Sequence, residues 1–301
     1  MRIEKKATII SSTTAALLVI FKLVIGIMSG SVAVLASAID SLLDLSVSVF
    51  NFFALHQSER VPDETFNFGR GKLEAVASVV EGTIISISGL FILYSAIEKI
   101  ITPHTIQHMN ASIAVMGFSI VATALLVLFL SRVAKMNNNL VIRADALHYK
   151  TDLFSNGAIL LSLVIIEFSG FQLIDPLLGV GIALYMIYSA FPIMKEGLMM
   201  LLDVSLSKEE IARINTMLSR NLQINGFHHL QTRRAGSDIF VSVHLVFDDN
   251  TLLLDAHRVS DQIESMMRML FPNDRVHSFI HIDPYDDSDI NLDEVRQLYA
   301  T

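Results

Sequence analysis

The sequence lacks cysteine throughout its 301 residues. This absence excludes disulfide bonds, thiolate metal ligands and cysteine nucleophiles, so any metal site has to use His, Asp and Glu. Charged residues make up only 17% of the chain, and the formal net charge is -8. No basic stripe with interleaved aromatic residues occurs, so we do not expect nucleic-acid binding.

Several motifs of soluble enzymes are also missing. The sequence contains no HExxH, no GxSxG and no nucleotide-binding loop. An intramembrane enzyme with paired Asp or a His–Asp metal centre is an alternative, but it would have to admit water and substrate at membrane depth. We therefore expect that the chain is not an enzyme.

What the chain does have is apolar sequence. Hydrophobic residues make up 52% of it, and the mean hydropathy is +0.53. These values indicate a membrane protein with a soluble part. Six segments are long enough to span a bilayer: 8–30, 33–56, 75–98, 108–132, 141–168 and 173–196. The first lacks a cleavage site after a short apolar core, so we expect it to be a retained helix.

Lys and Arg are distributed unequally between the short loops. One set of loops, including the N-terminus, carries Arg2, Lys5, Lys6, Arg60, Arg70, Lys72, Arg132, Lys135 and Arg143. The alternate loops contribute only Lys99. The positive-inside rule then predicts a multi-pass membrane protein with both termini cytoplasmic.

From about residue 206 the sequence becomes more polar. Periodicity predicts helices at 207–221 and 254–270 and strands at 228–234, 238–247 and 276–283. Ser207 and Glu210 have the spacing of a helix capping box. The order αββαβ predicts a small two-layer α+β domain. We therefore expect a transmembrane domain at 1–205, a cytoplasmic domain at 206–287 and an acidic tail at 288–301.

Two polar pairs interrupt the apolar segments. Asp40 and Asp44 lie in one segment, and His148 and Asp152 lie in another. Residues four apart share a helix face, and ionisable residues at membrane depth are costly unless they are functional. One imidazole and several carboxylates suit a tetrahedral divalent cation, with Zn2+ the best fit. Helix-packing residues, or a proton relay without metal, are the alternatives.

Four motifs together resemble those of the cation diffusion facilitator family. They are DSLLD, NFGRGKLE, ADALHYKTD and HIDP, and the resemblance covers nearly the whole chain. It is closest to the bacterial zinc- and iron-efflux members. The resemblance implies a homodimer with six transmembrane helices per protomer and a cytoplasmic metallochaperone-like (ferredoxin-like) domain. Members of this type exchange a divalent metal for protons across a lipid bilayer.

The resemblance also implies roles for particular residues. The transport site would be Asp40, Asp44, His148 and Asp152. This pattern is used for zinc and cadmium, and manganese members usually have Asp at the position of His148. A cytoplasmic binuclear zinc site would consist of His228, His244, His257, His281 and Asp283. Lys72 and Asp203 match a salt bridge that holds family dimers together, whereas His229 and His277 are additional to the pattern.

One stretch departs from the family pattern. The loop PDETFNFGRGKLE keeps the acidic ligand of a further zinc site as Asp63, but Phe66 and Arg70 stand where the family has two histidines. Phenylalanine offers no ligand, and arginine stays protonated. We therefore predict that this loop site is absent or much weakened.

These observations favour a Zn2+ efflux transporter that exchanges metal for protons. Zn2+ would be both the substrate and a cytoplasmic structural or regulatory ion. A transporter whose main substrate is Fe2+, Cd2+, Co2+ or Ni2+ is an alternative, because ligand type does not fix the metal. A membrane metal sensor or scaffold without transport activity is another.

Overall fold

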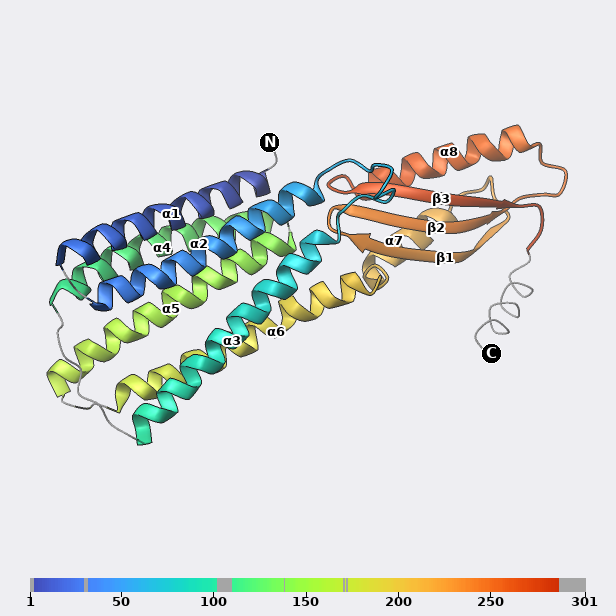
Figure 1. Cartoon of the computed structure of the whole chain (residues 1–301). Coiled ribbons are helices and arrows are strands. Elements are labelled where there is room, and N and C mark those ends of the chain that lie inside the picture. Colours follow the sequence, from blue (N-terminus) through green and yellow to red (C-terminus); the bar gives the residue numbers. More distant parts are fainter. Residues whose placement is uncertain are drawn as a thin grey trace. The chain divides into compact units, whose positions relative to one another are not determined.

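The computed structural model describes residues 3–29, 32–101, 110–137, 139–169, 171 and 173–286. The acidic tail expected at 288–301 lies outside these residues. The chain divides into two compact units, Met1–Leu198 and Met199–Thr301. We call them the membrane unit and the C-terminal unit and describe each by itself (Figure 1).

The membrane unit consists of long helices. They are α1 (Ile3–Ser29), α2 (Val32–Ser58), α3 (Leu73–Ile101), α4 (Asn110–Asn137), α5 (Leu140–Ser169) and α6 (Ile174–Leu201). All six are long and apolar enough to cross a membrane. The six predicted spans are therefore confirmed, and the chain is a multi-pass membrane protein. Most of the helices extend beyond the apolar runs, because helical hydrogen bonding continues through polar residues.

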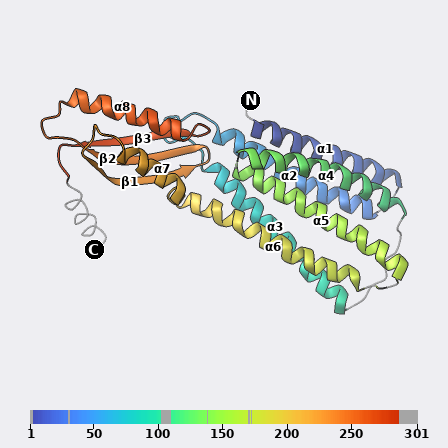
Figure 2. The same cartoon turned by 180° about the vertical axis from the view of Figure 1, so that it is seen from behind.

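Two packing arrangements hold these helices together. A buried cluster that includes Ala7, Leu55, Leu130 and Ile142 joins α1, α2, α4 and α5. The helices α3 and α6 lie together at one side of the unit (Figure 2). Their contact is close at Gly82, where a Cβ atom would lie only 2.3 Å from Cγ of Met194. Small residues of this kind allow membrane helices to approach one another closely.

The C-terminal unit has the predicted αββαβ order. Its elements are α7 (Lys208–Ser219), β1 (Gly226–Ala235), β2 (Asp238–Val246), α8 (Leu253–Leu270) and β3 (Arg275–Asp283). The sheet order is β1-β2-β3. The hairpin strands β1 and β2 are antiparallel, whereas β2 and β3 are parallel, with α8 between them in the chain. Parallel neighbours need such a crossover connection.

The alternation along β2 explains the two layers. Ile239, Val241, Val243 and Leu245 are fully buried, whereas His244 on the other face is half-buried. The helices contribute Ile214 and Leu218 from α7 and Ile263 and Met267 from α8 to the same core. The capping box predicted for Ser207 and Glu210 is present at the start of α7. Both helices thus pack on one face of the sheet, and the other face is left for polar side chains.

Candidate metal sites

The first candidate site lies where α2 and α5 face each other in the membrane unit. His148 Nε2 lies 3.4 Å from Oδ1 of Asp44 and 3.6 Å from Oδ2 of Asp152. The three ligand atoms all lie within 4.8 Å of one another. The His148 side chain is only 8% exposed. The structure therefore brings together three of the four residues expected to form the transport site. We call these three the membrane ligand group.

Asp40 is the fourth expected residue, and the structure places it outside the membrane ligand group. It lies one turn before Asp44 on α2 and is exposed. Beside it, Lys22 on α1 donates a hydrogen bond from Nζ to Oγ of Ser41, at 2.8 Å. A cavity of about 20 Å³ is lined by Lys22, Asp44 and Asp152, among others. That volume holds about one water-sized particle.

A second group of polar side chains adjoins the membrane ligand group. Asn51 on α2, Glu81 on α3 and Asp145 on α5 are all fully buried. The residue pattern does not single out Glu81, because a single glutamate in an apolar span has no partner at helical spacing. The signal that was available is its charge at membrane depth, which is itself unusual.

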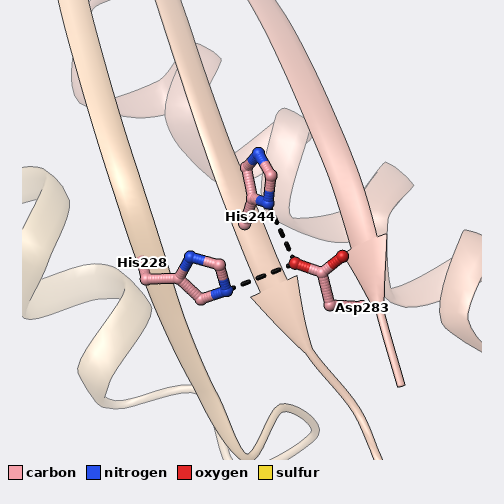
Figure 3. Close-up of side chains that lie close together, drawn as sticks. All are labelled: His228, His244 and Asp283. Atoms are coloured by element: carbon pink, nitrogen blue, oxygen red, sulfur yellow. Dashed lines mark hydrogen bonds and ion pairs between the residues drawn. The ribbon is translucent and has the colours of Figure 1, made fainter. Parts of the chain in front are cut away.

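The second candidate site lies on the polar face of the C-terminal sheet. His228 Nε2 and His244 Nδ1 lie 3.2 and 2.9 Å from Oδ2 of Asp283 (Figure 3). His281 Nε2 lies 3.0 Å from the other oxygen, Oδ1, of Asp283. The strand register produces this arrangement, because His244 is paired with His228 on β1 and with His281 on β3. We call these four residues the sheet ligand group.

Two further histidines of this unit lie elsewhere. His257 is on α8, is 66% exposed and has Nε2 at 3.8 Å from Oδ2 of Asp261. The structure does not bring it to the sheet ligand group. His277 Nε2 is within 2.9 Å of Oδ1 of Asp238, and its ring stacks on Phe240. His277 therefore has structural contacts of its own.

His229 lies beside the sheet ligand group because of an irregularity in β1. A β-bulge lies between His228 and Gln231, and His229 has a φ of 49°. Its ring centroid is 4.9 Å from that of His228 and 5.2 Å from that of His244. Its Nε2 is buried and has no hydrogen-bond partner. A bulge re-aims a side chain that regular alternation would place on the opposite face.

The residues of the expected dimer salt bridge belong to different units. Lys72 lies just before α3 and is half-buried. Asp203 follows α6 and accepts a hydrogen bond from Nη1 of Arg233 at 3.1 Å within the C-terminal unit. The pairing of Lys72 with Asp203 stays a prediction.

In the loop between α2 and α3, both oxygens of Asp63 accept hydrogen bonds from other groups of the loop. Oδ1 of Asp63 accepts hydrogen bonds from the backbone N–H groups of Phe66 and Thr65, at 2.8 and 3.0 Å. Oδ2 accepts one from Arg70, whose guanidinium lies 4.3 Å from the ring centre of Phe66. The backbone N–H of Phe66 and the Arg70 side chain hold the pKa of Asp63 below its usual value. The Arg70 guanidinium therefore lies against Asp63, the one ligand of the family's loop site that this sequence retains.

The structure combines six helices that are able to cross a membrane with a group of two carboxylates and one imidazole from two of them. These features define a class, the multi-pass membrane proteins that bind or transport cations. Two family models match the chain. The cation efflux transmembrane domain matches residues 8–202, and the cytoplasmic domain of cation efflux proteins matches residues 206–285. The chain belongs to the cation diffusion facilitator family.

Individual relatives agree with this assignment. The chain is 35% identical to the cation-efflux pump FieF of Citrobacter koseri over 283 residues, which cover 94% of this chain and 93% of that protein. The FieF pump of Klebsiella pneumoniae is 34% identical with the same coverage. A solved structure of CzrB, described in terms of zinc transport, is 34% identical and covers 27% of this chain and 99% of its own, with a TM-score of 0.26. Because the named relatives are pumps, the expectation of a transporter rather than an enzyme is confirmed.

Proposed function

We propose that this chain exports a divalent metal cation, Zn2+ above others, in exchange for protons. The observation that carries the proposal is the membrane ligand group, in which one imidazole and two carboxylates from two spans meet. The relatives named as cation-efflux pumps support the direction of transport.

The spacing of the ligand atoms supports zinc. Ligand atoms bound at the usual zinc distances in a tetrahedral arrangement lie about 3.3 to 3.6 Å apart. His148 Nε2 lies 3.4 and 3.6 Å from the carboxylate oxygens of Asp44 and Asp152. Asp40, one turn from Asp44, is proposed as the fourth ligand in the loaded state.

The same residues can couple metal to protons. A proton on Nε2 of His148 would interact favourably with both carboxylates, so the same nitrogen can serve either a proton or a metal ion. Zinc binding at that nitrogen requires the proton to leave, and a returning proton displaces the metal. In such carriers, helices rock around a fixed site near the middle of the membrane. The side chains of the membrane ligand group thus supply both a metal site and a proton acceptor.

The sheet ligand group is proposed as the cytoplasmic binuclear site. Asp283 presents Oδ2 to His228 and His244 and Oδ1 to His281. A carboxylate with histidines at both of its oxygens suits a ligand that bridges two ions. The strained backbone of His229 and its buried Nε2 favour it as an additional ligand. His257 remains a proposed ligand on its resemblance alone.

The assembly is proposed as a homodimer in the inner membrane with both termini cytoplasmic. The matched cytoplasmic-domain model and the one-sided Lys and Arg distribution support it. The proposed division remains a transport domain at 1–205 and a metal-binding dimerisation domain at 206–287. Lys72 and Asp203 are its proposed salt-bridge residues. Metal in the sheet ligand group would tighten the dimer and bias the transport cycle.

Zinc flux in proteoliposomes tests the proposal. We expect Asp44→Asn to reduce zinc flux, and the accompanying proton movement, by about a hundredfold or more, because a ligand loses its charge. Glu98→Gln is the matched control, since Glu98 is exposed on α3. Unchanged flux in Asp44→Asn would contradict the proposal. Wild-type protein that binds zinc without any flux would instead favour a sensor or scaffold.

A further inference from the structure

The buried group formed by Asn51, Glu81 and Asp145 has no role in the metal site described above. The side chains come from α2, α3 and α5, and each residue is 0% exposed. Asp145 precedes His148 by one helical turn on α5. Glu81 lies between Ala77 and Ile85, which are buried one turn before and after it on α3. A carboxylate thus lies on the buried face of a membrane helix, with an apolar side chain one turn to either side.

The hydrogen bonding of this group is incomplete. Nδ2 of Asn51 donates to Oε2 of Glu81 at 2.8 Å and to Oδ1 of Asp145 at 3.4 Å. Oε1 of Glu81, Oδ2 of Asp145 and Oδ1 of Asn51 are buried without a hydrogen-bond partner. Ser11 on α1 lies beside Asp145, but its hydroxyl donates to the carbonyl of Thr8 at 3.1 Å. Three acceptor oxygens therefore remain without a donor in one buried place.

Glu74 on the same helix shows the contrast. It lies two turns before Glu81 and is also buried, at 4% exposure. Asn139 donates to its Oε2 at 2.7 Å, and the Ser58 hydroxyl, which also lies 2.9 Å from the carbonyl of Leu55, is 3.1 Å from its Oε1. Both oxygens of Glu74 therefore have a polar group within hydrogen-bond distance, as is usual for buried carboxylates. Glu81 differs because its Oε1 has no hydrogen-bond partner.

The charges near this group decide what it can bind. Glu81 is faced by Asp145, His148 and Asp152, and Asp145 is faced by His148 and Tyr149. Among the residues described, no hydrogen bond or ion pair joins Glu81 or Asp145 to His148. Two ionised carboxylates that share one neutral amide donor, away from water, repel each other. A proton on one of them removes a negative charge and supplies a donor to one of the unpaired oxygens.

We propose that Glu81 and Asp145 together hold one exchangeable proton beside the membrane ligand group, and that cation binding there releases it. This inference rests on the proposed function, because it names a second proton site for the same exchange. Zn2+ binds the membrane ligand group, one proton leaves the carboxyl pair for solvent, and both carboxylates are then ionised. Reprotonation restores the pair after the metal has left. The arriving positive charge drives the release because it stabilises the ionised pair.

A metal ion fits this group less well than a proton. The group offers oxygen atoms only and no imidazole, which disfavours zinc. Magnesium and calcium prefer six or more oxygen ligands, including waters, whereas the buried group supplies three free oxygens. A proton needs only one of them.

Calorimetric zinc titration of the full-length protein tests the proposal. Titrations in buffers of different ionisation enthalpy give the number of protons released per zinc bound at the membrane ligand group. Asp44→Asn identifies the component that belongs to that group. We expect Glu81→Gln to release about one proton fewer than wild type, because the amide cannot ionise. Glu98→Gln is the control, with an exposed carboxylate on the same helix. Its proton release is expected to equal that of wild type.

The outcomes separate the two proposals. Zinc binding without any proton release in wild type would contradict the exchange itself. Equal release from wild type and Glu81→Gln would overturn only the carboxyl pair. Loss of a whole zinc equivalent in Glu81→Gln would overturn it in favour of a metal site. If Glu81→Gln does not fold, Asp145→Asn is measured in the same way, and the same loss of about one proton is expected.

Discussion

The two ligand groups have similar compositions but different supports. In each group, three ligand atoms lie within 4.8 Å of one another: those of Asp44, His148 and Asp152 in the first, and those of His228, His244 and Asp283 in the second. In the membrane unit the ligands come from two helices, α2 and α5, which contact each other only through side chains. In the C-terminal unit they come from three hydrogen-bonded strands, whose spacing is fixed at about 4.8 Å. A helix-supported site can change its ligand distances when a helix moves, whereas a sheet-supported site keeps them.

Water access separates the two groups as well. The His148 side chain is 8% exposed, whereas that of His281 is 65% exposed. Charge changes in the membrane ligand group have to be balanced by neighbouring protein groups, because water is scarce there. Solvent can balance them in the sheet ligand group. The comparison therefore favours transport for the first group and metal-dependent regulation for the second.

The largest effect is expected on the choice of transported metal, which distinguishes the two ligand groups. We expect His148→Asp to lower the preference for zinc over manganese by about tenfold or more, because an oxygen ligand replaces nitrogen in the membrane ligand group. Competitive flux of the two metals in proteoliposomes measures this preference.

His281→Asp in the sheet ligand group is the matched variant for that measurement. It makes the same chemical change at the other site, and the flux preference is expected to stay within about twofold, because solvent-exposed ligands outside the spans do not select the transported ion. A preference that moves with His281→Asp and not with His148→Asp would reverse the assignment of the two groups.

A smaller effect is expected at His229. Asparagine tolerates the left-handed backbone, so His229→Asn removes the imidazole while keeping the bulge. We expect zinc affinity of the sheet ligand group to fall about tenfold, with flux little changed at saturating zinc. Chelator competition on the full-length protein measures the affinity. His277→Asn is the control, because His277 bonds to Asp238 instead. Equal affinities in wild type and His229→Asn would show that His229 is not a ligand.

The sequence predicted those features that depend on periodicity. The alternation in β2 identified Ile239, Val241 and Leu245 as core, and all three are fully buried. The spacing of four also placed His148 and Asp152 on one face of α5. The spacing did not show which of Asp40 and Asp44 lies close to His148, because that depends on how α5 packs against α2. The position of His229 depends on a bulge, which has no local signal in the sequence. Glu81 is marked only by its charge at membrane depth, because its polar neighbours come from other helices.

The smallest effect is expected at the start of α7, where Glu210 makes the stability of the C-terminal unit depend on pH. Burial alone would raise the pKa of Glu210, but the Ser207 backbone N–H and hydroxyl, together with Arg234, outweigh it and lower the pKa below the ordinary 4.5. The stabilisation is therefore present above the ordinary value and is lost as the pH falls through the lowered one. Because the group is partly exposed to solvent, we expect Glu210→Gln to cost only about 0.5 kcal/mol at pH 7. The difference from wild type should shrink towards acidic pH. Hydrogen exchange of the α7 amides measures this difference in stability. Glu209→Gln is the control, because Glu209 is exposed. A difference that grows as the pH falls would contradict the assigned sign.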